Sequence, residues 1–284
     1  MVTLSDYAGL QPTWCPGCGN FGILKALNKA LVELEIEPHQ VLLVSGIGQA
    51  GKLPHYTKGN IFNSLHGRPV PPAIGAKIAN PELVVIAVSG DGDAYGEGGN
   101  HFVHAARRNH DITYLVHNNQ VYGLTKGQAS PTSDTGFVTK TTPHGAVSPV
   151  NPIALAIVCG ASFVGRSFAG DIAHLSDIIK KGIAHRGFAL IDILQPCVSF
   201  NRKNTYQWYR ERLYKLESES GYDPGDKKAA LEKALEWGEK IPVGVIYRNE
   251  LPVYEDGLPA LTKGPLVRQG IDPARVERLL AEFV

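Results

Sequence analysis

The chain has 284 residues, of which 28 are Lys or Arg and 27 are Asp or Glu, and charged residues make up 19%. This length suits one large α/β domain, or one domain with an appended tail. The near-neutral charge without a basic patch argues against nucleic acid as a partner, and no apolar run approaches the ~20 residues that cross a membrane.

The N-terminal region predicts an extended arm over residues 1–13, without the basic and apolar parts of a signal peptide, so we expect a cytoplasmic protein. Cys15-Pro16-Gly17-Cys18 then forms a tight turn that points both sulfurs to one place. Such a pair serves zinc, an iron–sulfur cluster or a redox disulfide, and the pattern alone does not choose among them. Two chance cysteines in a turn are the plainer alternative.

A helix over residues 21–34 and a strand over residues 41–45 follow, and the strand runs into a glycine-rich loop. Lys52 in this loop could neutralise a carboxylate of a substrate, although a solvated lysine is the plainer interpretation. His66 lies in a later turn and could steer a proton, because the pKa of histidine lies near working pH. A structural histidine is the alternative there. A helix is expected over residues 73–79.

The most specific pattern lies between residues 83 and 128. An uncharged strand (83–89) runs into Gly90-Asp91-Gly92, a helix follows, and a second apolar strand (112–116) leads to Asn118-Asn119. Two parallel strands joined by a helix form a right-handed βαβ unit, whose carboxyl edge is where open α/β sheets bind ligands. Asp91 and Asn119 are therefore expected to lie close together.

Carboxylate and amide oxygens are ligands that suit Mg²⁺, which completes its octahedron with phosphate and water. We expect the nearby glycines to let the backbone approach a diphosphate closely; they are Gly90, Gly92, Gly96, Gly98 and Gly99. A glycine-rich turn and an asparagine turn without a ligand are the alternative. The combination of strand, helix, strand and Asn-Asn favours the metal site.

The rest of the chain continues the alternation of strand and helix. A loop over residues 129–146 precedes a helix ending at Cys159, a strand (163–167), a helix (172–185) and a strand (189–194). This order predicts a mainly parallel sheet flanked by helices. Cys197 follows the last strand, where it can join Cys15 and Cys18. Cys159 lies in an apolar helical run and is interpreted as a buried core thiol.

The composition changes after Asn201, where charged aromatic and Lys-rich segments begin. We expect helices from Tyr206 and over residues 226–239, and a strand over residues 243–247. Since this region has no catalytic signature, we divide the chain into a ligand-binding domain (1–200) and an extension (201–284) that wraps the core or a partner subunit.

Gly90-Asp91-Gly92 with Asn118-Asn119 downstream resembles the thiamine-diphosphate signature. The continuation VYGLTKGQASPTS is similar to the β subunits of 2-oxoacid:ferredoxin oxidoreductases, and the resemblance extends from Trp14 to about Tyr209. It implies the thiamine-diphosphate-binding fold, with Mg²⁺ held by Asp91, Asn119 and the backbone carbonyl of Val121.

The resemblance also assigns site residues. The implied cofactor-binding residues are Gly17, Cys18, Gly48, His66, Gly90, Asp91, Gly92, Asp93, Asn119, Val121, Gly123, Leu124 and Thr125. Lys126, Gly127 and Gln128 would lie beside the diphosphate or the substrate channel. The implied catalytic residues are His66, Lys52 and Leu124. Lys52 and the Gly-Leu-Thr-Lys stretch favour 2-oxoglutarate as the substrate, while pyruvate and branched 2-oxoacids stay open.

A 4Fe-4S cluster, which normally takes four thiolates, is also implied by the resemblance. The matching positions supply Cys15, Cys18 and Cys197, but the fourth position is Gln49, and a later candidate position holds Gly59. The fourth ligand could be Gln49, water or a group from another chain. It is also open whether the cluster is assembled at all.

The implied reaction is the oxidative decarboxylation of a 2-oxoacid to acyl-coenzyme A and CO₂, with electrons passed through the cluster to ferredoxin. The resemblance also implies that the enzyme is active only with its α subunit, because in this family the glutamate that activates the cofactor comes from the other polypeptide. Neither Glu82 nor Glu97 is a convincing candidate for that glutamate in this chain. One alternative is a thiamine decarboxylase or carboligase without a redox centre. Another is a non-catalytic electron-transfer or zinc-stabilised assembly subunit, which leaves Asp91 and Asn119 unexplained.

Overall fold

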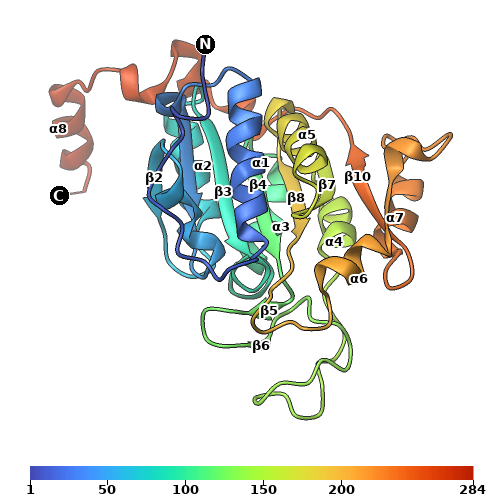
Figure 1. The fold of residues 1–284 in the computed structure, drawn as a ribbon. Coiled ribbons are helices and arrows are strands. Elements are labelled where there is room, and N and C mark those ends of the chain that lie inside the picture. The colour runs from blue at the N-terminus through green and yellow to red at the C-terminus, as the bar shows by residue number, and fades with distance from the viewer. Residues whose placement is uncertain (284) are drawn as a thin grey trace.

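The computed structural model describes residues 1–283, and a mixed eight-stranded sheet runs through its centre (Figure 1). The strand order is β2-β1-β3-β4-β8-β7-β10-β9, and neighbouring strands are parallel except β7 and β10. The strands are β1 (Val41–Ser45), β2 (Asn60–Asn63), β3 (Val84–Gly90), β4 (Thr113–Asn118), β7 (Phe163–Phe168), β8 (Ala189–Leu194), β9 (Leu213–Lys215) and β10 (Ile241–Arg248). The mainly parallel sheet predicted from the sequence is confirmed.

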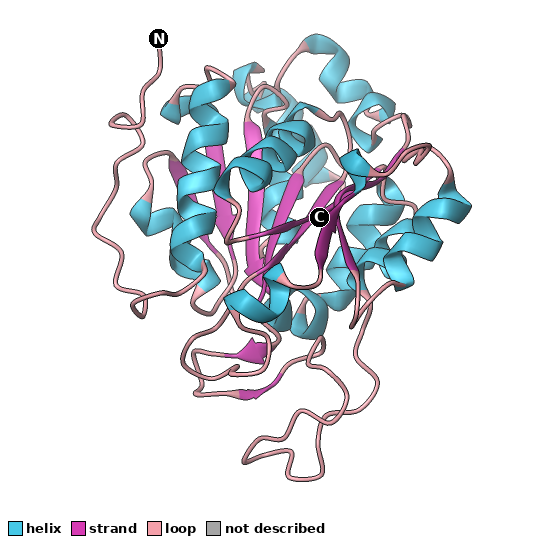
Figure 2. Ribbon diagram, turned by 45° about the vertical axis from the view of Figure 1, so that its right-hand side comes forward, coloured by secondary structure: helices cyan, strands magenta, loops and turns pink. Residues whose placement is uncertain are grey.

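Helices cover both faces of the sheet (Figure 2). Helices α1 (Asn20–Glu33) and α5 (Ile172–Ala184) pack side by side on one face, over a core that includes Leu27, Leu31 and Ile178. The other face is covered by α2 (Val70–Ala79), α3 (Gly99–Arg108), α4 (Pro152–Cys159) and α7 (Lys227–Leu235). Strands β4, β7 and β8 are buried along their whole length, which is why they form apolar runs in the sequence.

Most predicted elements end within a few residues of the observed ones. The predicted strand 112–116 continues to Asn118, because β4 pairs with β8 up to the pair Asn118–Leu194. The first asparagine of the Asn-Asn pair is therefore part of the sheet, and only Asn119 opens the loop. A π-helical turn, Gly92–Glu97, stands between β3 and α3. The predicted helix 226–239 ends earlier, at Leu235.

The segment after Asn201 contains more of the sheet than its composition indicated. Helix α6 (Tyr206–Arg210) leads into β9, and β10 pairs antiparallel with β7. Residues 213–248 thus extend the same sheet that carries the earlier strands. The predicted strand over residues 243–247 corresponds to β10, but its pairing with β7 was not predicted, because we assigned this region to an extension that wraps the core or a partner.

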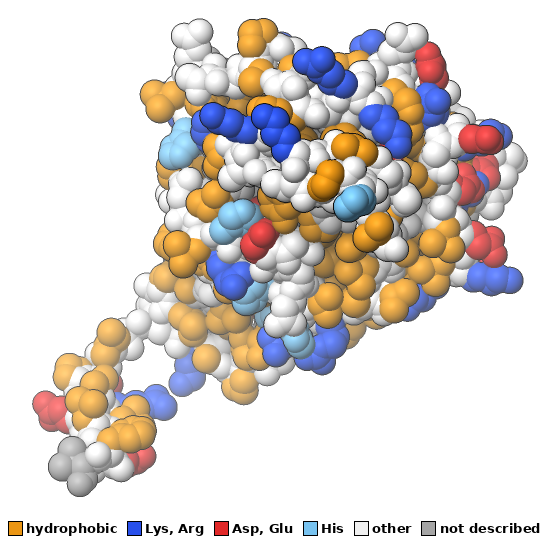
Figure 3. Space-filling model, turned by 90° about the horizontal axis from the view of Figure 1, so that it is seen from below, with side chains coloured by type: hydrophobic (Ala, Val, Ile, Leu, Met, Phe, Trp, Pro, Cys, Tyr) orange, Lys and Arg blue, Asp and Glu red, His pale blue; other side chains and the backbone are white. Residues whose placement is uncertain are grey.

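The last part of the chain contacts α2 through the 3-10 turn Leu266–Arg268 and ends in α8 (Pro273–Ala281), which has no buried residue. Arg268 anchors this part to the body through an ion pair with Glu82. Helix α8 projects from the body as a separate lobe, at the left of Figure 1 and the lower left of Figure 3. None of the helices described is long and apolar enough to span a membrane.

Candidate functional site

The polar residues that follow β3 and β4 meet at the carboxyl edge of the sheet. The two strands are parallel neighbours, and Gly90 lies opposite His117. The backbone N–H of Asn119 faces the Oδ1 atom of Asp91 at 3.4 Å, and the Asn119 side-chain oxygen accepts from the Val121 N–H at 3.0 Å. The predicted proximity of Asp91 and Asn119 is confirmed.

Asp91 is a buried carboxylate, and only one of its two oxygens accepts short hydrogen bonds. Its Oδ2 accepts hydrogen bonds from the hydroxyls of Ser130 (2.5 Å) and Thr132 (2.7 Å). Oδ1 has only the long contact with Asn119, and within residues 1–283 no Lys, Arg or His side chain pairs with the carboxylate. Burial raises the pKa of Asp91 to about 6. A buried carboxylate without a basic partner is costly when ionised, so this oxygen fits a bound cation.

The loop after β4 turns sharply at Gln120, whose φ of 59° lies in the left-handed region. Such a conformation is uncommon for a residue other than glycine and needs support from its surroundings. The buried Gln120 side chain donates to the Thr132 carbonyl at 2.7 Å and to Asp134 at 3.1 Å, and accepts from the Tyr209 hydroxyl at 3.2 Å. The turn that presents Asn119 and Val121 is thereby fixed.

Asp93 connects three segments around the site. Its carboxylate accepts hydrogen bonds from the Ile47 N–H (3.0 Å), the Gly67 N–H (2.7 Å) and the Ser89 hydroxyl (2.6 Å). The Nδ1 atom of His66 lies 2.8 Å from the same carboxylate. Burial raises the pKa of Asp93. Asp93 therefore fixes the loop after β1 and orients the ring of His66, a role that the sequence analysis did not foresee.

A hollow at this edge brings together most of the residues predicted to bind the cofactor. It is lined by Gly48, His66, Gly90, Asp91, Gly92, Asp93, Asn119, Val121, Gly123, Leu124 and Thr125. Ile47, Ala50 and Tyr122 also line it and were missed. Lys52, Gly17 and Cys18 are not part of this lining; Lys52 is half-buried in the 3-10 helix Ala50–Tyr56, shortly after Ala50.

The glycines around Asp91 make room mainly for the protein itself. A Cβ atom on Gly92 would lie 2.2 Å from the Tyr122 ring, and one on Gly98 would lie 2.7 Å from the Asp93 carbonyl oxygen. A Cβ atom on Gly90 would have no neighbouring atom closer than 3.9 Å. Close internal packing is thus one reason for glycine at positions 92 and 98, and the approach of a diphosphate to these glycines stays a prediction.

A second hollow beside the first contains the three cysteines that the sequence analysis grouped. Cys15, Cys18 and Cys197 line it together with Gln49, and the two hollows share Gln49, Asn119 and Gly123. The Trp14 indole N–H donates to the Gln49 carbonyl at 2.9 Å. Across residues 1–283, no group of three or more His, Cys, Asp or Glu side chains is compact enough to hold one metal ion.

The sulfurs of this thiol hollow have polar neighbours. Cys18 accepts from the Gln195 amide at 3.3 Å, and Cys15 accepts from the Ser199 hydroxyl at 3.2 Å. Burial raises the pKa of the Cys18 thiol to about 11. Hydrogen bonds to sulfur are one of the means by which proteins tune iron–sulfur clusters, so the environment fits such a group. Cys159 is half-buried on α4 and does not line this hollow.

Comparisons with known proteins agree with this geometry. Residues 45–193 match the family described as "Thiamine pyrophosphate enzyme, C-terminal TPP binding domain", and residues 197–263 match the family of the C-terminal region of the pyruvate ferredoxin oxidoreductase β chain. A 2-oxoacid:ferredoxin oxidoreductase subunit beta from a Sulfolobus species is 50% identical over 260 residues, which cover 87% of this chain and 85% of that protein. The corresponding protein of Saccharolobus solfataricus is 51% identical over 250 residues, covering 84% and 82%.

A solved structure is similar over nearly the whole chain. It is a 2-oxoglutarate:ferredoxin oxidoreductase from Magnetococcus marinus with 2-oxoglutarate, coenzyme A and succinyl-CoA bound. The sequence identity is 35% and the TM-score is 0.90, over 98% of this chain and 96% of that chain. The match therefore spans the sheet and most of the C-terminal extension.

Proposed function

The chain belongs to the β subunits of the 2-oxoacid:ferredoxin oxidoreductases, and from that premise we propose that it forms the magnesium- and thiamine-diphosphate-binding half of an active site for 2-oxoglutarate. The observation that carries this proposal is Asp91, a buried carboxylate beside Asn119 with one oxygen free of strong hydrogen bonds. Titration of thiamine diphosphate with Mg²⁺ into the assembled enzyme tests it, followed by an assay of ferredoxin reduction that depends on 2-oxoglutarate and coenzyme A.

Three groups of the chain would hold the metal: the Asp91 carboxylate, the Asn119 side-chain oxygen and the Val121 carbonyl. They are hard oxygen donors, and a single carboxylate is the number that Mg²⁺ usually takes beside phosphate and water. Ser130 and Thr132 occupy Oδ2 of Asp91 and so direct Oδ1 toward the ligand. Thiamine diphosphate, when bound, would supply a thiazolium carbon that adds to the 2-oxo carbonyl and accepts electrons as CO₂ leaves.

His66 is proposed to act at the substrate. Asp93 holds Nδ1 of the ring, and Glu97 approaches the same nitrogen at 3.5 Å, so the other ring nitrogen is left to hold a proton or a substrate carboxylate. The His66 side chain is 41% exposed and lines the hollow beside Asp91. This position suits a group that meets substrate rather than one that supports the core.

Lys52 and Leu124 are proposed to select the substrate. Leu124 lines the hollow and is 45% exposed. Lys52 comes two positions after Ala50, which also lines the hollow. An ammonium group at this edge would pair with the second carboxylate of 2-oxoglutarate, which pyruvate lacks. The solved relative from Magnetococcus marinus holds 2-oxoglutarate, which supports the same substrate class.

Replacing Lys52 by alanine is expected to raise the KM for 2-oxoglutarate by about 10-fold or more, the effect of losing roughly 1.4 kcal/mol of charge pairing, and to change the KM for pyruvate little. Steady-state ferredoxin reduction with each substrate measures this. Lys58→Ala is the matched control, because Lys58 is exposed on the same segment. Equal increases for both substrates would show that Lys52 does not bind the distal carboxylate.

The thiol hollow is proposed to hold an iron–sulfur cluster on Cys15, Cys18 and Cys197, with Gln49 at the fourth position. The hollow adjoins the Asp91 hollow, and the two share three lining residues. A cluster there would accept electrons from the decarboxylated substrate and pass them to ferredoxin. The hydrogen bonds to Cys15 and Cys18 support this assignment.

The α subunit is the proposed partner of the C-terminal extension. Beyond β10 the chain exposes large apolar side chains: Val267, Ile271, Val276, Leu279, Leu280 and Phe283. An amphipathic helix that buries nothing within its own chain is typical of a segment that packs on a partner. The α subunit would supply the glutamate that activates the cofactor.

Changing both Leu279 and Leu280 to aspartate is expected to reduce the amount of α subunit that co-purifies with the chain. The two leucines are 48% and 62% exposed on α8, and charge on an apolar contact opposes burial. Analytical size exclusion of the co-expressed subunits measures the effect. Glu277→Ala on the same helix is the control, and undiminished assembly of the aspartate variant would exclude α8 from the interface.

A further inference from the structure

A buried arginine on β7 has no evident task in the chemistry described above. The Arg166 side chain is 2% exposed, and its Nε and Nη1 atoms have no hydrogen-bond partner among the residues described. Its guanidinium lies 5.6 Å from the centre of the Trp237 ring. A buried charge without hydrogen bonds is costly, so a residue kept only for packing would be better replaced by an apolar one.

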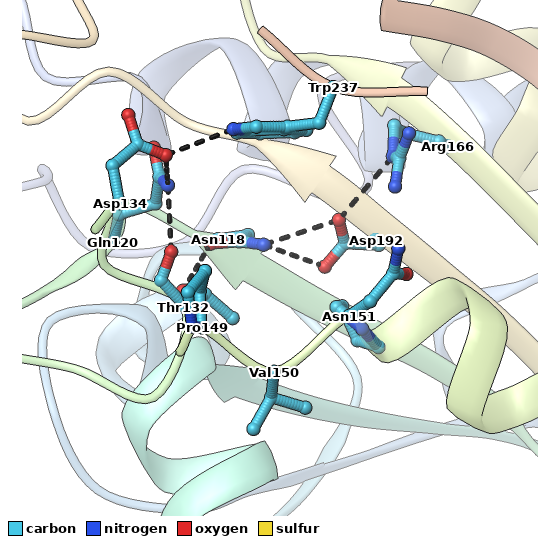
Figure 4. Close-up of a pocket in the computed structure, with 11 residues that line it drawn as sticks. Asn118, Gln120, Thr132, Asp134, Pro149, Val150, Asn151, Arg166, Asp192 and Trp237 are labelled. Atoms are coloured by element: carbon cyan, nitrogen blue, oxygen red, sulfur yellow. Dashed lines mark hydrogen bonds and ion pairs between the residues drawn. The ribbon is translucent and has the colours of Figure 1, made fainter. Parts of the chain in front are cut away.

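Arg166 lies beside a second buried charge, and both line the cavity shown in Figure 4. Its Nε atom lies 3.9 Å from Oδ2 of Asp192, which is 1% exposed on the neighbouring strand β8. At this distance the two groups interact as charges, and burial leaves them poorly screened. Asp192 also accepts hydrogen bonds from the Tyr95 hydroxyl at 2.9 Å and from the Asn118 amide at 3.1 Å.

The contacts continue from Asp192 to the carboxylate proposed to hold magnesium. The Asn118 amide nitrogen is directed to Asp192, so its oxygen faces the Thr132 hydroxyl at 2.9 Å. The same hydroxyl lies 2.7 Å from Oδ2 of Asp91. Asn118 is also the residue that precedes Asn119. Five side chains from five parts of the chain thus form one series of contacts: Arg166, Asp192, Asn118, Thr132 and Asp91.

We propose that Arg166 and Asp192 are positioning residues for the metal end of the active site, a step that rests on the function proposed above. The charge of Arg166 keeps Asp192 as an acceptor for the Asn118 amide. That hydrogen bond fixes the Asn118 side chain at the end of β4, directly before Asn119. The Asn118 oxygen and Oδ2 of Asp91 share the single hydrogen of the Thr132 hydroxyl. Without Arg166, Asp192 becomes a buried carboxylate with no positive partner, the Asn118 amide loses its fixed orientation, and the end of β4 that leads into Asn119 is held less firmly.

The test measures Mg²⁺ affinity at saturating thiamine diphosphate, by calorimetry on the assembled enzyme. Arg166→Met keeps an unbranched but shorter side chain and removes its charge. We expect a loss of about 10-fold in Mg²⁺ affinity, the lower end of the range for removing a partner of a metal ligand, because Arg166 acts through Asp192 and Asn118. The iron content should stay unchanged. Arg186→Met is the matched control, because Arg186 is exposed and pairs with Asp256 away from the site.

A double variant separates charge balance from packing. Arg166→Met combined with Asp192→Asn removes both charges, and the new amide oxygen can still accept from Asn118, so Mg²⁺ affinity should return close to that of the natural chain. A double variant as weak as Arg166→Met, or an Arg166→Met enzyme with a lower melting temperature and unchanged Mg²⁺ affinity, overturns the proposal.

A variant that does not fold, or a natural enzyme that does not bind the cofactor, is interpreted separately. If Arg166→Met does not fold, the double variant is compared with the natural chain directly, and recovered folding with full Mg²⁺ affinity supports the charge pair, while weak Mg²⁺ binding refutes it. If the natural enzyme itself binds no thiamine diphosphate in the presence of Mg²⁺, the proposed function fails. A natural enzyme that binds normally beside an equally tight Arg166→Met enzyme refutes only the positioning role.

Discussion

Replacing Asp91 by alanine is expected to abolish magnesium-dependent binding of thiamine diphosphate to the assembled enzyme. The change removes the single carboxylate at the site, and neither Asn119 nor the Val121 carbonyl carries a charge that could compensate. Calorimetric titration of thiamine diphosphate with and without Mg²⁺ measures the loss. Asp177→Ala, on the outer surface of α5, is the control for removing an aspartate.

The pH dependence of Mg²⁺ binding checks the same assignment. Burial raises the pKa of Asp91 from 3.8 to about 6, so below that pH the carboxyl is mostly protonated and Mg²⁺ must displace the proton. Mg²⁺ affinity should therefore be about tenfold weaker at pH 5 than at pH 7. Asp91→Asn should bind weakly at both values. Tight, pH-independent binding by the natural enzyme, or retained binding by Asp91→Ala, would rule out the metal role of Asp91.

Replacing Gln49 by cysteine is expected to protect the proposed cluster against air. A cuboidal four-iron cluster needs one terminal ligand for each iron, and the thiol hollow supplies three thiolates and the amide of Gln49. The iron without a thiolate should leave first, so the natural chain should fall to about three irons in air while the Gln49→Cys chain keeps about four. Iron and sulfide analysis, with the EPR signal of an oxidised three-iron cluster, measures the difference.

Two cysteine variants serve as the controls for iron content in this experiment. Cys18→Ser should lose the cluster, because Cys18 lines the hollow and its sulfur already accepts a hydrogen bond from Gln195. Cys159→Ser should leave iron unchanged, because Cys159 lies on α4 away from the hollow. Equal iron retention by the natural and Gln49→Cys chains would mean that another group completes the cluster. No iron in either, with thiamine diphosphate still bound, would point to an electron route through another centre.

The meeting of Asp91 and Asn119 could be predicted because it follows from local patterns and one topological rule. Two uncharged strands separated by a helix become parallel neighbours, and parallel strands end at the same edge of the sheet. The register of β3 and β4 then leaves little freedom in where the two residues lie. Cys15, Cys18 and Cys197 could be grouped by the same reasoning, since Cys197 follows a strand that ends at that edge.

The supports of the site could not be predicted, since each joins parts of the chain that are far apart and carry no periodic signal. Ser130 and Thr132 reach Asp91 from a loop without regular structure, and Tyr209 reaches Gln120 from the segment that we had assigned to an extension. Asp93 was expected to contact the cofactor, but in the structure its carboxylate oxygens accept hydrogen bonds from backbone and side-chain groups of three segments.

The sequence by itself determined the sheet, the edge at which ligands bind and the residue types placed there, because strand and helix periodicity and the carboxyl-edge rule are local properties. The tertiary structure decided which charges are buried together and which loops close over the site. Arg166 and Asp192 illustrate this: each lies in an apolar strand as an isolated charged residue, and only the pairing of β7 with β8 sets them face to face.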